Sequence, residues 1–309
     1  MTRPPSHAGT ATLAIHPGAL GDVLLAVPAL RALRGASGGP LVLAAQPRIG
    51  ALLESLAVVD GHLAFDALGL DALFVDDPAR RPRLPDAERV VCWFGARDPV
   101  FVRRLAELVP GAGVASSVGD DRPVWEHLLA TVQAPPGDRC APIVAPAVVR
   151  ALGAEALAAA RVDMPPPWLI VHPGAGSAAK CWPAEAFARV ITAVAARARM
   201  NVVAHQGPAD AGAAAALRRH LGAGVAWLVE PALPALAGAL VHAQAYLGND
   251  SGVSHLAAAL GVPSLVLFDA RHLAWRPWSG TARVRTVTLA EAVEREVEAV
   301  AAELVEVLR

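Results

Sequence analysis

The stretch TLAIHPGALGDVLLAVPALRALR, residues 12–34, joins a short apolar run to a longer amphipathic one. The first run has the length of a buried strand, and the second has its apolar residues at helical spacing. Between the two runs, His16-Pro17 favours extended backbone and Gly18 permits a tight turn. The stretch therefore predicts a strand, a turn and a helix, which is the unit from which parallel α/β sheets are built.

The tetrapeptide HPGA of this stretch occurs again at residues 172–175, half a chain later. The second copy also follows an apolar run, WLIV, and it precedes the helix-length run PAEAFARVITAV. We interpret each copy as the turn after the first strand of a Rossmann-like half. Such turns lie at the carboxyl edge of the sheet, where α/β proteins bind ligands.

Strand-length and helix-length runs alternate through the rest of the chain, as expected for βαβ units on a parallel sheet. Residues 68–89 are predicted as an irregular loop. We expect further strands at residues 41–45, 90–95, 200–206, 225–230, 244–249 and 263–270. We expect further helices at residues 47–56, 99–111, 183–199, 208–222, 231–243, 250–261 and 289–309.

The length of 309 residues is more than one hydrophobic core usually takes, so two domains are expected. We predict an N-terminal Rossmann-like domain at residues 1–160 and a C-terminal Rossmann-like domain at residues 168–290. A proline-containing linker at residues 161–167 would join them. Residues 291–309 form a separate C-terminal helix in this prediction.

The composition excludes several classes of protein. The chain is 54% hydrophobic and 18% charged, which rules out a disordered chain. Its net charge of −1 gives no overall attraction to nucleic acid. The cysteines Cys92, Cys140 and Cys181 form no C-x-x-C pair, as expected for reduced thiols in a cytoplasmic protein.

No transmembrane segment or signal peptide is expected. Two prolines precede the first apolar run, which a signal peptide would not have. The longest apolar run, residues 232–248, is interrupted by Pro234, His242 and Gln244. We therefore predict a cytoplasmic location.

Asp22 follows the first HPGA turn at the predicted start of a helix. Two interpretations are open at this point. Its carboxylate could stabilise the N-terminus of the helix, or it could face a cleft at the edge of the sheet as a general base. Gly18 and Gly21 beside it would let another backbone or a sugar approach closely.

The second HPGA turn continues into a glycine-rich segment that ends in a lysine, GAGSAAK. Its spacing is not that of a Walker P-loop. The backbone N–H groups of Gly174, Gly176 and Ser177, together with the ammonium of Lys180, nevertheless suit a diphosphate. The alternative is a solvated loop with a surface lysine.

A third motif, NDSGVSH, covers residues 249–255. Asp250, Ser251 and Gly252 lie between a predicted strand and a predicted helix, where they offer capping groups and free N–H groups for an anion. His255 follows one turn later and could face the same ligand. Without such a ligand, a lone helical histidine is a structural residue.

Two acidic pairs raise the question of a metal site. They are Asp76-Asp77 and Asp120-Asp121, and both lie in segments rich in proline or glycine. Neither forms a D-x-D pattern, so we interpret both as solvated turns and predict no metal.

Cationic and aromatic side chains complete the set of candidates. Arg97, Arg103 and Arg104 follow a predicted strand and could meet an anionic acceptor, or they could form a solvated helix face. Trp275 and Trp278 could stack on a sugar or a base, or they could pack between domains.

Three of these motifs together resemble glycosyltransferase family 9, the ADP-heptose:lipopolysaccharide heptosyltransferase family. They are GALGDVLLAVPALRALR, HPGAGSAAKCWPAEAFARV and NDSGVSHLAAALGVPSLVLF, within a similarity that extends over residues 13–277. The resemblance implies the GT-B fold, an α/β fold in which two Rossmann-like domains with parallel sheets face each other across a cleft. The donor would lie on the C-terminal domain and the acceptor mostly on the N-terminal one, and the C-terminal helix would cross back to the first domain.

The resemblance also implies roles for residues in the matched motifs. The catalytic aspartate of the family falls on Asp22, and its phosphate-binding lysine falls on Lys180. The donor-binding set is Gly174, Gly176, Ser177, Lys180, Asp210, Leu233, Asp250, Ser251, Gly252 and His255, and the acceptor-side set is Gly18, Gly21 and Arg97. The chain departs from the family pattern at Asp210, because members often carry a ribose-binding glutamate in that region, and at residues 174–177, which are mostly Gly and Ala.

The activity implied is inverting, metal-independent sugar transfer from a nucleotide-diphosphate sugar, with ADP-heptose as the favoured donor. The acceptor would be a lipopolysaccharide core or another glycan or glycolipid. Asp22 would deprotonate the acceptor hydroxyl, and Lys180 with the N–H groups of Ser251 and Gly252 would stabilise the departing diphosphate from the opposite wall of the cleft. No cofactor and no nucleic acid is expected, and the location is cytoplasmic, or peripheral at the cytoplasmic face of the inner membrane. The alternatives are a GT-B nucleotide-sugar epimerase and a non-catalytic nucleotide-sugar-binding protein.

Overall fold

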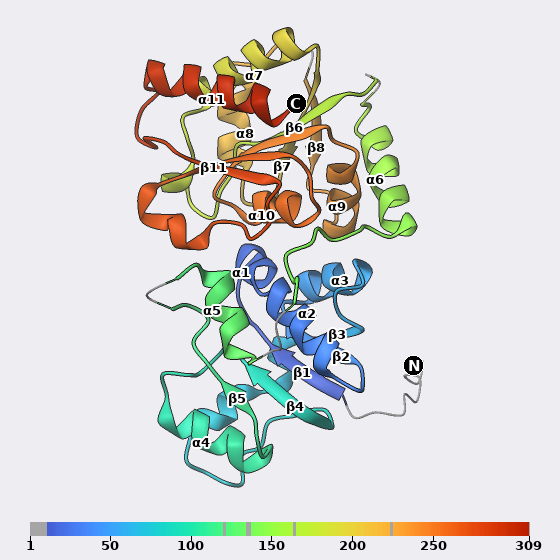
Figure 1. Cartoon of the computed structure of the whole chain (residues 1–309), viewed down its shortest axis with the longest axis vertical. Coiled ribbons are helices and arrows are strands. Elements are labelled where there is room, and N and C mark those ends of the chain that lie inside the picture. The colour runs from blue at the N-terminus through green and yellow to red at the C-terminus, as the bar shows by residue number, and fades with distance from the viewer. Residues whose placement is uncertain (1–10, 120–121, 134–136, 163–164, 223–224, 309) are drawn as a thin grey trace. The chain divides into compact units, whose positions relative to one another are not determined.

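The structure is a computed structural model that describes residues 11–119, 122–133, 137–162, 165–222 and 225–308. The chain divides into two compact units, Met1–Arg139 and Cys140–Arg309 (Figure 1). Each unit contains one sheet in which all strand pairs are parallel, so the predicted α/β class with two parallel sheets is confirmed.

The sheet of the first unit has five strands in the order β3-β2-β1-β4-β5. The strands are β1 Ala11–Ile15, β2 Leu41–Ala45, β3 Gly61–Ala64, β4 Ala87–Cys92 and β5 Gly113–Val114. The helices are α1 Leu20–Leu25, α2 Val27–Ala36, α3 Pro47–Ser55, α4 Pro99–Leu108 and α5 Val124–Thr131, with 3-10 helices at Phe65–Leu68 and Leu70–Phe74. Leu13 and Ile15 of the central strand β1 are fully buried, and they lie in one core with Phe101 and Leu105 of α4.

The sheet of the second unit has six strands in the order β11-β10-β9-β6-β7-β8. The strands are β6 Trp168–His172, β7 Asn201–Gln206, β8 Ala226–Val229, β9 Ala245–Asn249, β10 Ser264–Phe268 and β11 Ala282–Thr286. The helices are α6 Ala147–Ala159, α7 Ala184–Ala198, α8 Ala211–Arg218, α9 Leu233–Val241, α10 Gly252–Ala259 and α11 Glu294–Val307, with 3-10 helices at Ala178–Lys180 and Ala270–Trp275. The apolar residues of β6 and of α7, among them Val171 and Phe187, meet in one buried core.

Both sheets have the same strand order, read from the first strand of each unit. The second and third strands lie on one side of that first strand, and the fourth and fifth lie on the other side. The loops after the first and fourth strands therefore leave at the point where the strand order reverses, which is the usual ligand site of such sheets. Each HPGA turn follows such a first strand, as predicted.

Pro28 divides the helix predicted after the first HPGA turn, where the sequence indicates one helix with a kink at this proline. The continuous helix expected at residues 22–35 is two helices, α1 and α2, and Pro28 is the second residue of α2. Proline supplies no N–H group and its ring clashes with the preceding turn, so a new helix begins there.

Several elements lie outside the sequence predictions. Strands β3, β5 and β11 and helices α5 and α6 were not expected, and the last helix begins at Glu294 and not at residue 289. The short strands lack an apolar alternation that would mark them, since β11 reads ARVRT and β5 has two residues.

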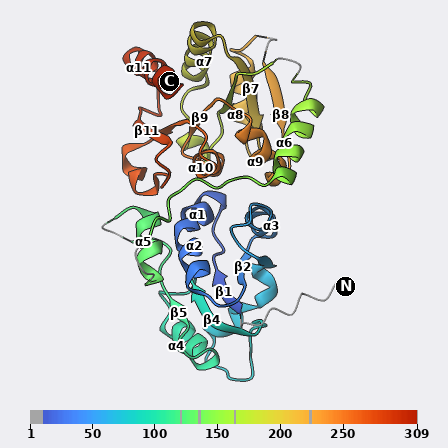
Figure 2. The same cartoon turned by 45° about the vertical axis from the view of Figure 1, so that its right-hand side comes forward.

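The boundary between the units lies at Arg139 and Cys140, about twenty residues before the predicted linker at 161–167. The reason is α6, which lies alongside α9 of the second unit (Figure 2). A Cβ atom placed on Gly153 of α6 would lie 2.0 Å from the carbonyl carbon of Gly238 in α9, so only glycine lets these two backbones approach so closely.

Helix α11 packs against α7 and β10 of its own unit, where Val297, Val300 and Leu304 are buried (Figure 2). The packing makes α11 part of the second unit. The crossing of residues 291–309 to the first domain stays a prediction.

The contact between α6 and α9 can be tested with Gly153→Ala. We expect the added methyl group to lower the free energy of unfolding by about 1–3 kcal/mol, because it meets backbone atoms that cannot move aside. Denaturant unfolding of the full chain measures this change.

Gly212→Ala in α8 is the matched control, because a Cβ atom there meets nothing within 4 Å. This variant should be neutral or more stable by up to about 1 kcal/mol, since alanine is the better helix former. A Gly153→Ala protein as stable as the Gly212→Ala protein would contradict the packing described for α6.

Candidate functional site

The first HPGA turn is stabilised by hydrogen bonds between its own backbone and nearby side chains. The Gly18 N–H donates to Nδ1 of His16 at 3.2 Å, and the Ala19 N–H donates to Oδ2 of Asp22 at 3.2 Å. A Cβ atom on Gly18 would lie 2.7 Å from the His16 ring and 2.9 Å from Cβ of Asp22, so this position requires glycine. Asp22 is the third residue of α1 and is partly buried, which is compatible with both interpretations given for it above.

His16 is 2% exposed and packs 5.8 Å, centre to centre, from the ring of Trp93. Burial lowers its pKa to about 4, against the opposing effect of the nearby Asp22 carboxylate. The imidazole is therefore neutral at neutral pH, and because Nδ1 accepts the Gly18 N–H, the proton is on Nε2. That Nε2 group has no hydrogen-bond partner among the described residues.

The three arginines after β4 differ from one another. Arg103 pairs with Asp76 at 2.6 Å, and the buried Arg104 donates to the carbonyls of Ala72, Val75 and Arg80. Those two side chains are structural, and only Arg97 is exposed and without a bonded partner among the described residues. Gly21 lies within α1, and no contact with it bears on an acceptor.

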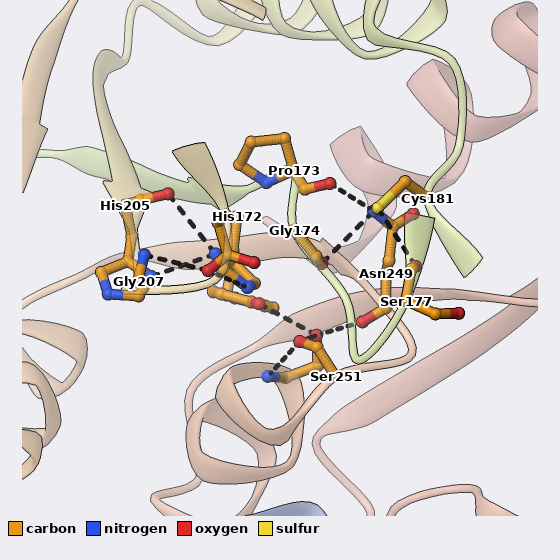
Figure 3. A network of polar contacts seen from close by, with 12 residues as sticks. His172, Pro173, Gly174, Ser177, Cys181, His205, Gly207, Asn249 and Ser251 are labelled. Atoms are coloured by element: carbon orange, nitrogen blue, oxygen red, sulfur yellow. Dashed lines mark hydrogen bonds and ion pairs between the residues drawn. The ribbon is translucent and has the colours of Figure 1, made fainter. Parts of the chain in front are cut away.

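The second HPGA turn is tied to the end of β9 by Asn249 (Figure 3). The Asn249 amide Nδ2 donates to the carbonyl of Pro173 at 2.8 Å, and its Oδ1 accepts the Trp182 N–H at 3.1 Å. Asn249 is fully buried, so both bonds form away from water. One side chain therefore fixes the two ends of the glycine-rich loop.

The glycines of this loop serve different purposes. Gly174 is buried, and a Cβ atom there would lie 2.0 Å from Oδ1 of Asp210. Gly176 and Ser177 are exposed, and a Cβ atom on Gly176 would meet nothing within 4 Å. Gly174 is thus required by packing, whereas Gly176 and Ser177 leave their backbone open to a ligand.

Asp210 is the predicted donor residue whose geometry differs most from its expected role. Its side chain is 11% exposed, and its Oδ2 accepts the Gly207 N–H at 2.9 Å. The Asp210 carboxylate is mostly buried, and its Oδ2 lies 3.7 Å from Nε2 of His172. These contacts indicate that Asp210 supports the two loops around it.

His172 and His205 form a buried pair on the neighbouring strands β6 and β7 (Figure 3). Their Nδ1 atoms are 3.0 Å apart, so one imidazole donates and the other accepts. Burial lowers the pKa of both rings, and each pair member remains neutral at neutral pH. The pair thus places an uncharged ring, that of His172, next to the Asp210 carboxylate.

Lys180 and Asp250 form an ion pair of 2.8 Å between the loop after β6 and the loop after β9. His255 lies on the other side, with Nε2 at 3.8 Å from Oδ1 of Asp250. Burial would raise the pKa of Asp250, but His255 and Lys180 outweigh it and lower the pKa. The structure thus joins three of the predicted donor residues in one charged cluster.

Gly252 is the first residue of α10, and Ser251 is the cap that precedes it. The Ser251 hydroxyl accepts the Ser254 N–H at 3.2 Å as the helix cap, so the expected capping role is present. Leu233 is the first residue of α9, after β8. Trp278 is 8% exposed, which favours the packing interpretation for that ring.

Lys180 is the only lysine of the chain, since all other members of the 27 Lys and Arg residues are arginine. Arginine serves every other cationic role in the sequence. A compact ammonium with three donors differs from a planar guanidinium in what it can contact at once. At Lys180, one of these donors bonds Asp250.

The acidic pairs give no metal site in the described part of the chain. Asp76 is occupied by Arg103, and no group of three or more His, Cys, Asp or Glu side chains there is arranged to hold a metal ion. Asp120 and Asp121 lie outside the described residues. In the same described ranges, no helix combines the length and apolar content needed to cross a membrane.

Four functional candidates were missed by sequence reasoning: His16, His172, His205 and Asn249. The signal for the first two was in view, because each HPGA copy begins with a histidine at the end of a buried strand. Asn249 is likewise a polar residue that ends an apolar strand, in the run AYLGN. His205 becomes meaningful only through the pairing of β7 with β6.

Fold and site together define an α/β protein of the GT-B class with a candidate anion site at the carboxyl edge of its second sheet. The family model "Glycosyltransferase family 9 (heptosyltransferase)" matches residues 146–304, about half of the chain. The chain belongs to this family.

Among known proteins, the chain is similar to Lipopolysaccharide heptosyltransferase 3 of Escherichia coli, with 34% identity over 117 residues. That match covers 36% of this chain and 34% of the relative, so the chain matches about a third of the relative's length.

Two solved structures share the fold. The E. coli ADP-heptose lps heptosyltransferase II has a TM-score of 0.72 at 19% identity, over 96% of this chain and 98% of that one. A glycosyl transferase family 9 protein from Veillonella parvula has a TM-score of 0.71 at 17% identity, over 90% of this chain and 86% of that one. These likenesses confirm the predicted GT-B fold.

The buried His16 makes a prediction for the pH dependence of stability. Its pKa is about 4 in the folded protein against an ordinary value of 6.5, so the unfolded chain binds more protons between these values. The contribution is fully present above about pH 6.5 and is lost as the pH falls toward 4. His16→Gln should reduce the loss of unfolding free energy on acidification by up to about 3 kcal/mol.

Denaturant unfolding at pH 7 and pH 4.5 measures this difference. His220→Gln is the control, because His220 is exposed. His16→Gln and wild type losing the same free energy between the two pH values would show that His16 does not titrate as a buried group.

Proposed function

We propose that this chain is an inverting glycosyltransferase that transfers a sugar from a nucleotide-diphosphate donor, with ADP-heptose as the favoured donor. The observation that carries the proposal is the cluster of Lys180, Asp250 and the start of α10 beside the exposed backbone of Gly176 and Ser177. Loop N–H groups, a helix N-terminus and one ammonium are the usual partners of a diphosphate.

The relatives support the choice of donor and acceptor. The similar proteins include lipopolysaccharide heptosyltransferase 3 and a heptosyltransferase of E. coli solved with ADP, the latter at a TM-score of 0.69 and 17% identity. We propose ADP-heptose as donor and a lipopolysaccharide core, or a related glycolipid, as acceptor. A glycolipid acceptor would bring the protein to a membrane surface as a peripheral protein.

The proposed chemistry begins at Asp22. Its carboxylate takes the proton of the acceptor hydroxyl while that oxygen bonds to the anomeric carbon of the donor. The bond between the anomeric carbon and the diphosphate oxygen breaks on the opposite face, which inverts the configuration. The Ala19 N–H bond to Oδ2 orients the carboxylate and leaves Oδ1 for the proton.

The leaving diphosphate receives its stabilisation from the second unit. Lys180 has three donors, so its ammonium can keep Asp250 and still bond a phosphate oxygen. Gly252 supplies an N–H group at the start of α10, where the helix dipole favours an anion. This positive potential replaces a metal ion in the proposed mechanism.

Transfer itself is tested by product analysis with radiolabelled ADP-heptose and a truncated lipopolysaccharide acceptor. A labelled glycolipid supports the proposal. Release of ADP without a labelled acceptor, or conversion of the donor into another nucleotide sugar, would replace transfer by hydrolysis or epimerisation.

Asp22→Asn tests the base. We expect the transfer rate to fall by about 10²- to 10⁴-fold, since a carboxamide cannot accept the proton, with donor affinity unchanged. Glu126→Gln is the matched control, because Glu126 is the third residue of α5 as Asp22 is of α1. Near-normal transfer by Asp22→Asn removes this residue from the mechanism.

Lys180→Ala tests the diphosphate site by calorimetry. Affinity for ADP should fall by about 1.5–3 kcal/mol, the scale of a charge-assisted hydrogen bond, while adenosine binds as before. Lys180→Arg should recover only part of this loss, because a guanidinium cannot take the place of the ammonium beside Asp250. Equal losses for ADP and adenosine would give the loop another role.

A further inference from the structure

Three titratable side chains of the second unit lie together at the carboxyl edge of its sheet, and the proposed transfer uses none of them. His172 ends β6 and His205 lies in β7, and both rings are buried (Figure 3). The mostly buried Asp210 is the cap residue that precedes α8. Burying ionisable groups costs free energy unless their hydrogen bonds and charges are matched. The positions of the protons in this cluster therefore decide whether the matching is complete.

The hydrogen bonds of the histidine pair assign the proton of His172 to Nδ1. This atom lies 3.4 Å from the carbonyl oxygen of His205, which can only accept, and 3.0 Å from Nδ1 of His205. A proton on Nδ1 of His172 serves both contacts, whereas a lone pair there would face the carbonyl oxygen. Nδ1 of His205 is then the acceptor, and the neutral His205 ring carries its proton on Nε2.

The other nitrogen of His172 faces a carboxylate without a proton between them. With Nδ1 protonated, the neutral His172 ring has a lone pair on Nε2, and Oδ2 of Asp210 lies 3.7 Å away, too far for a hydrogen bond. Two acceptors therefore face each other. One added proton on Nε2 would make His172 an imidazolium that donates to His205 on one side and to Asp210 on the other.

The neutral state of His172 depends on a balance of opposing effects. Burial lowers its pKa by more than the Asp210 carboxylate and the His205 carbonyl raise it. The diphosphate of the proposed donor would bind at the loop that starts directly after His172. Its negative charge would shift the balance toward the imidazolium, because a nearby anion favours the charged form of a base.

Asp210 connects the cluster to this loop. A Cβ atom on Gly174 would lie 2.0 Å from Oδ1 of Asp210, so the carboxylate packs directly against the loop backbone. Burial and the Asp210 carboxylate both raise the pKa of the Cys181 thiol, and this thiol donates to the carbonyl of Ser177 at 3.6 Å. The charge of Asp210 thus acts on the segment where the diphosphate would bind, and without a proton beside it that charge would repel the ligand.

We propose that the His172–Asp210 pair takes up one proton when the nucleotide-diphosphate donor binds, and that His205 is a positioning residue that keeps Nε2 of His172 open to this proton. The proton comes from the solvent and returns to it when the nucleotide leaves. It offsets the charge of Asp210 beside the bound diphosphate. This inference rests on the proposed function, because that function supplies the ligand, and it makes donor affinity rise as the pH falls.

Three other groups around the cluster are poor proton acceptors. Burial lowers the pKa of His205, and the neighbouring His172 lowers it further, so a second positive charge there is disfavoured. Burial raises the pKa of Cys181 and of Tyr246, so both are already protonated at neutral pH.

His255 is the rival acceptor among the described residues around the loop. Its Nε2 lies 3.8 Å from Oδ1 of Asp250, and Oδ2 of the same carboxylate is paired with Lys180. His255 also lies in the proposed donor site. An experiment must therefore separate a proton on His172 from a proton on His255.

Calorimetry of donor binding to the full chain counts the protons. The ligand is ADP-heptose without an acceptor, because both of its phosphates are esterified, whereas the terminal phosphate of ADP itself titrates at about pH 6. Binding enthalpies measured in buffers of different ionisation enthalpy give the number of protons taken up. We expect a maximum of about 0.5–1 proton between about pH 5 and 8, and an affinity that rises about threefold to tenfold per pH unit there as the pH falls.

His172→Gln should bind the donor with uptake below about 0.2 proton and with little pH dependence, because its amide N–H can donate to Asp210 at every pH. His205→Leu removes the acceptor for Nδ1 of His172 and should also reduce the uptake. His205→Asn should restore it, since its Oδ1 can accept in the place of Nδ1. His255→Gln should keep the uptake even where it weakens binding, and the exposed His220→Gln is the control that should change nothing.

The outcomes separate this inference from the proposed function. Donor binding by the wild type without proton uptake overturns the inference, as does uptake that persists in His172→Gln and disappears in His255→Gln. Both results leave the proposed function standing. Proton-coupled binding of ADP-heptose without transfer to any acceptor overturns the proposed function and leaves the proton site, and an absence of binding overturns both.

Discussion

The buried amide of Asn249 is the interaction on which the candidate donor site depends. Through one side chain, the end of β9 holds both the first and the last part of the glycine-rich loop after β6. Both polar ends of this amide are satisfied without water, and an unmade bond there would cost about 1–3 kcal/mol. The fixed loop then carries Lys180 to Asp250, and the exposed backbone between them faces outward.

The two HPGA turns have the same sequence, but their histidines make different hydrogen bonds. In the first unit the imidazole bonds its own turn, and this bond shapes the loop that begins the helix of Asp22. In the second unit the imidazole turns to its neighbour strand, and the histidine pair supports the loops around Asp210. The same four residues therefore precede a short helix that carries Asp22 in one case and an exposed glycine-rich loop in the other.

Much of the fold could be predicted because the signals were local. A strand, a His-Pro-Gly turn and an amphipathic segment follow from the order of residues, whereas the division of that segment into α1 and α2 was not predicted. Helix α6 was missed because prolines flank it and its many alanines give no clear apolar face. Its position depends on the close contact of Gly153 with Gly238 of α9, which is distant in sequence. The short strand β11 depends on a neighbour, β10, more than on its own composition.

Residues of the candidate site could be predicted from the sequence, but the contacts between them could not. Lys180 and Asp250 were both identified from sequence, yet their ion pair arises because β6 and β9 are neighbours in the sheet, and no local pattern encodes that pairing. Asp210 shows the reverse case. Its type and position suggested a ligand contact, which stays a prediction, and the structure adds its contacts with Gly174 and Gly207, which no local pattern encodes.

A chain with a single lysine offers a single side-chain primary amine, and that amine lies in the candidate donor site. Lys180 is about one third exposed, so reagents that acylate amines can reach it. Any such modification neutralises the ammonium and leaves Asp250 with an unpaired carboxylate, which makes the loop net negative where an anion should bind. Among the side chains of this protein, acylation of a primary amine therefore reports on the Lys180 ammonium alone.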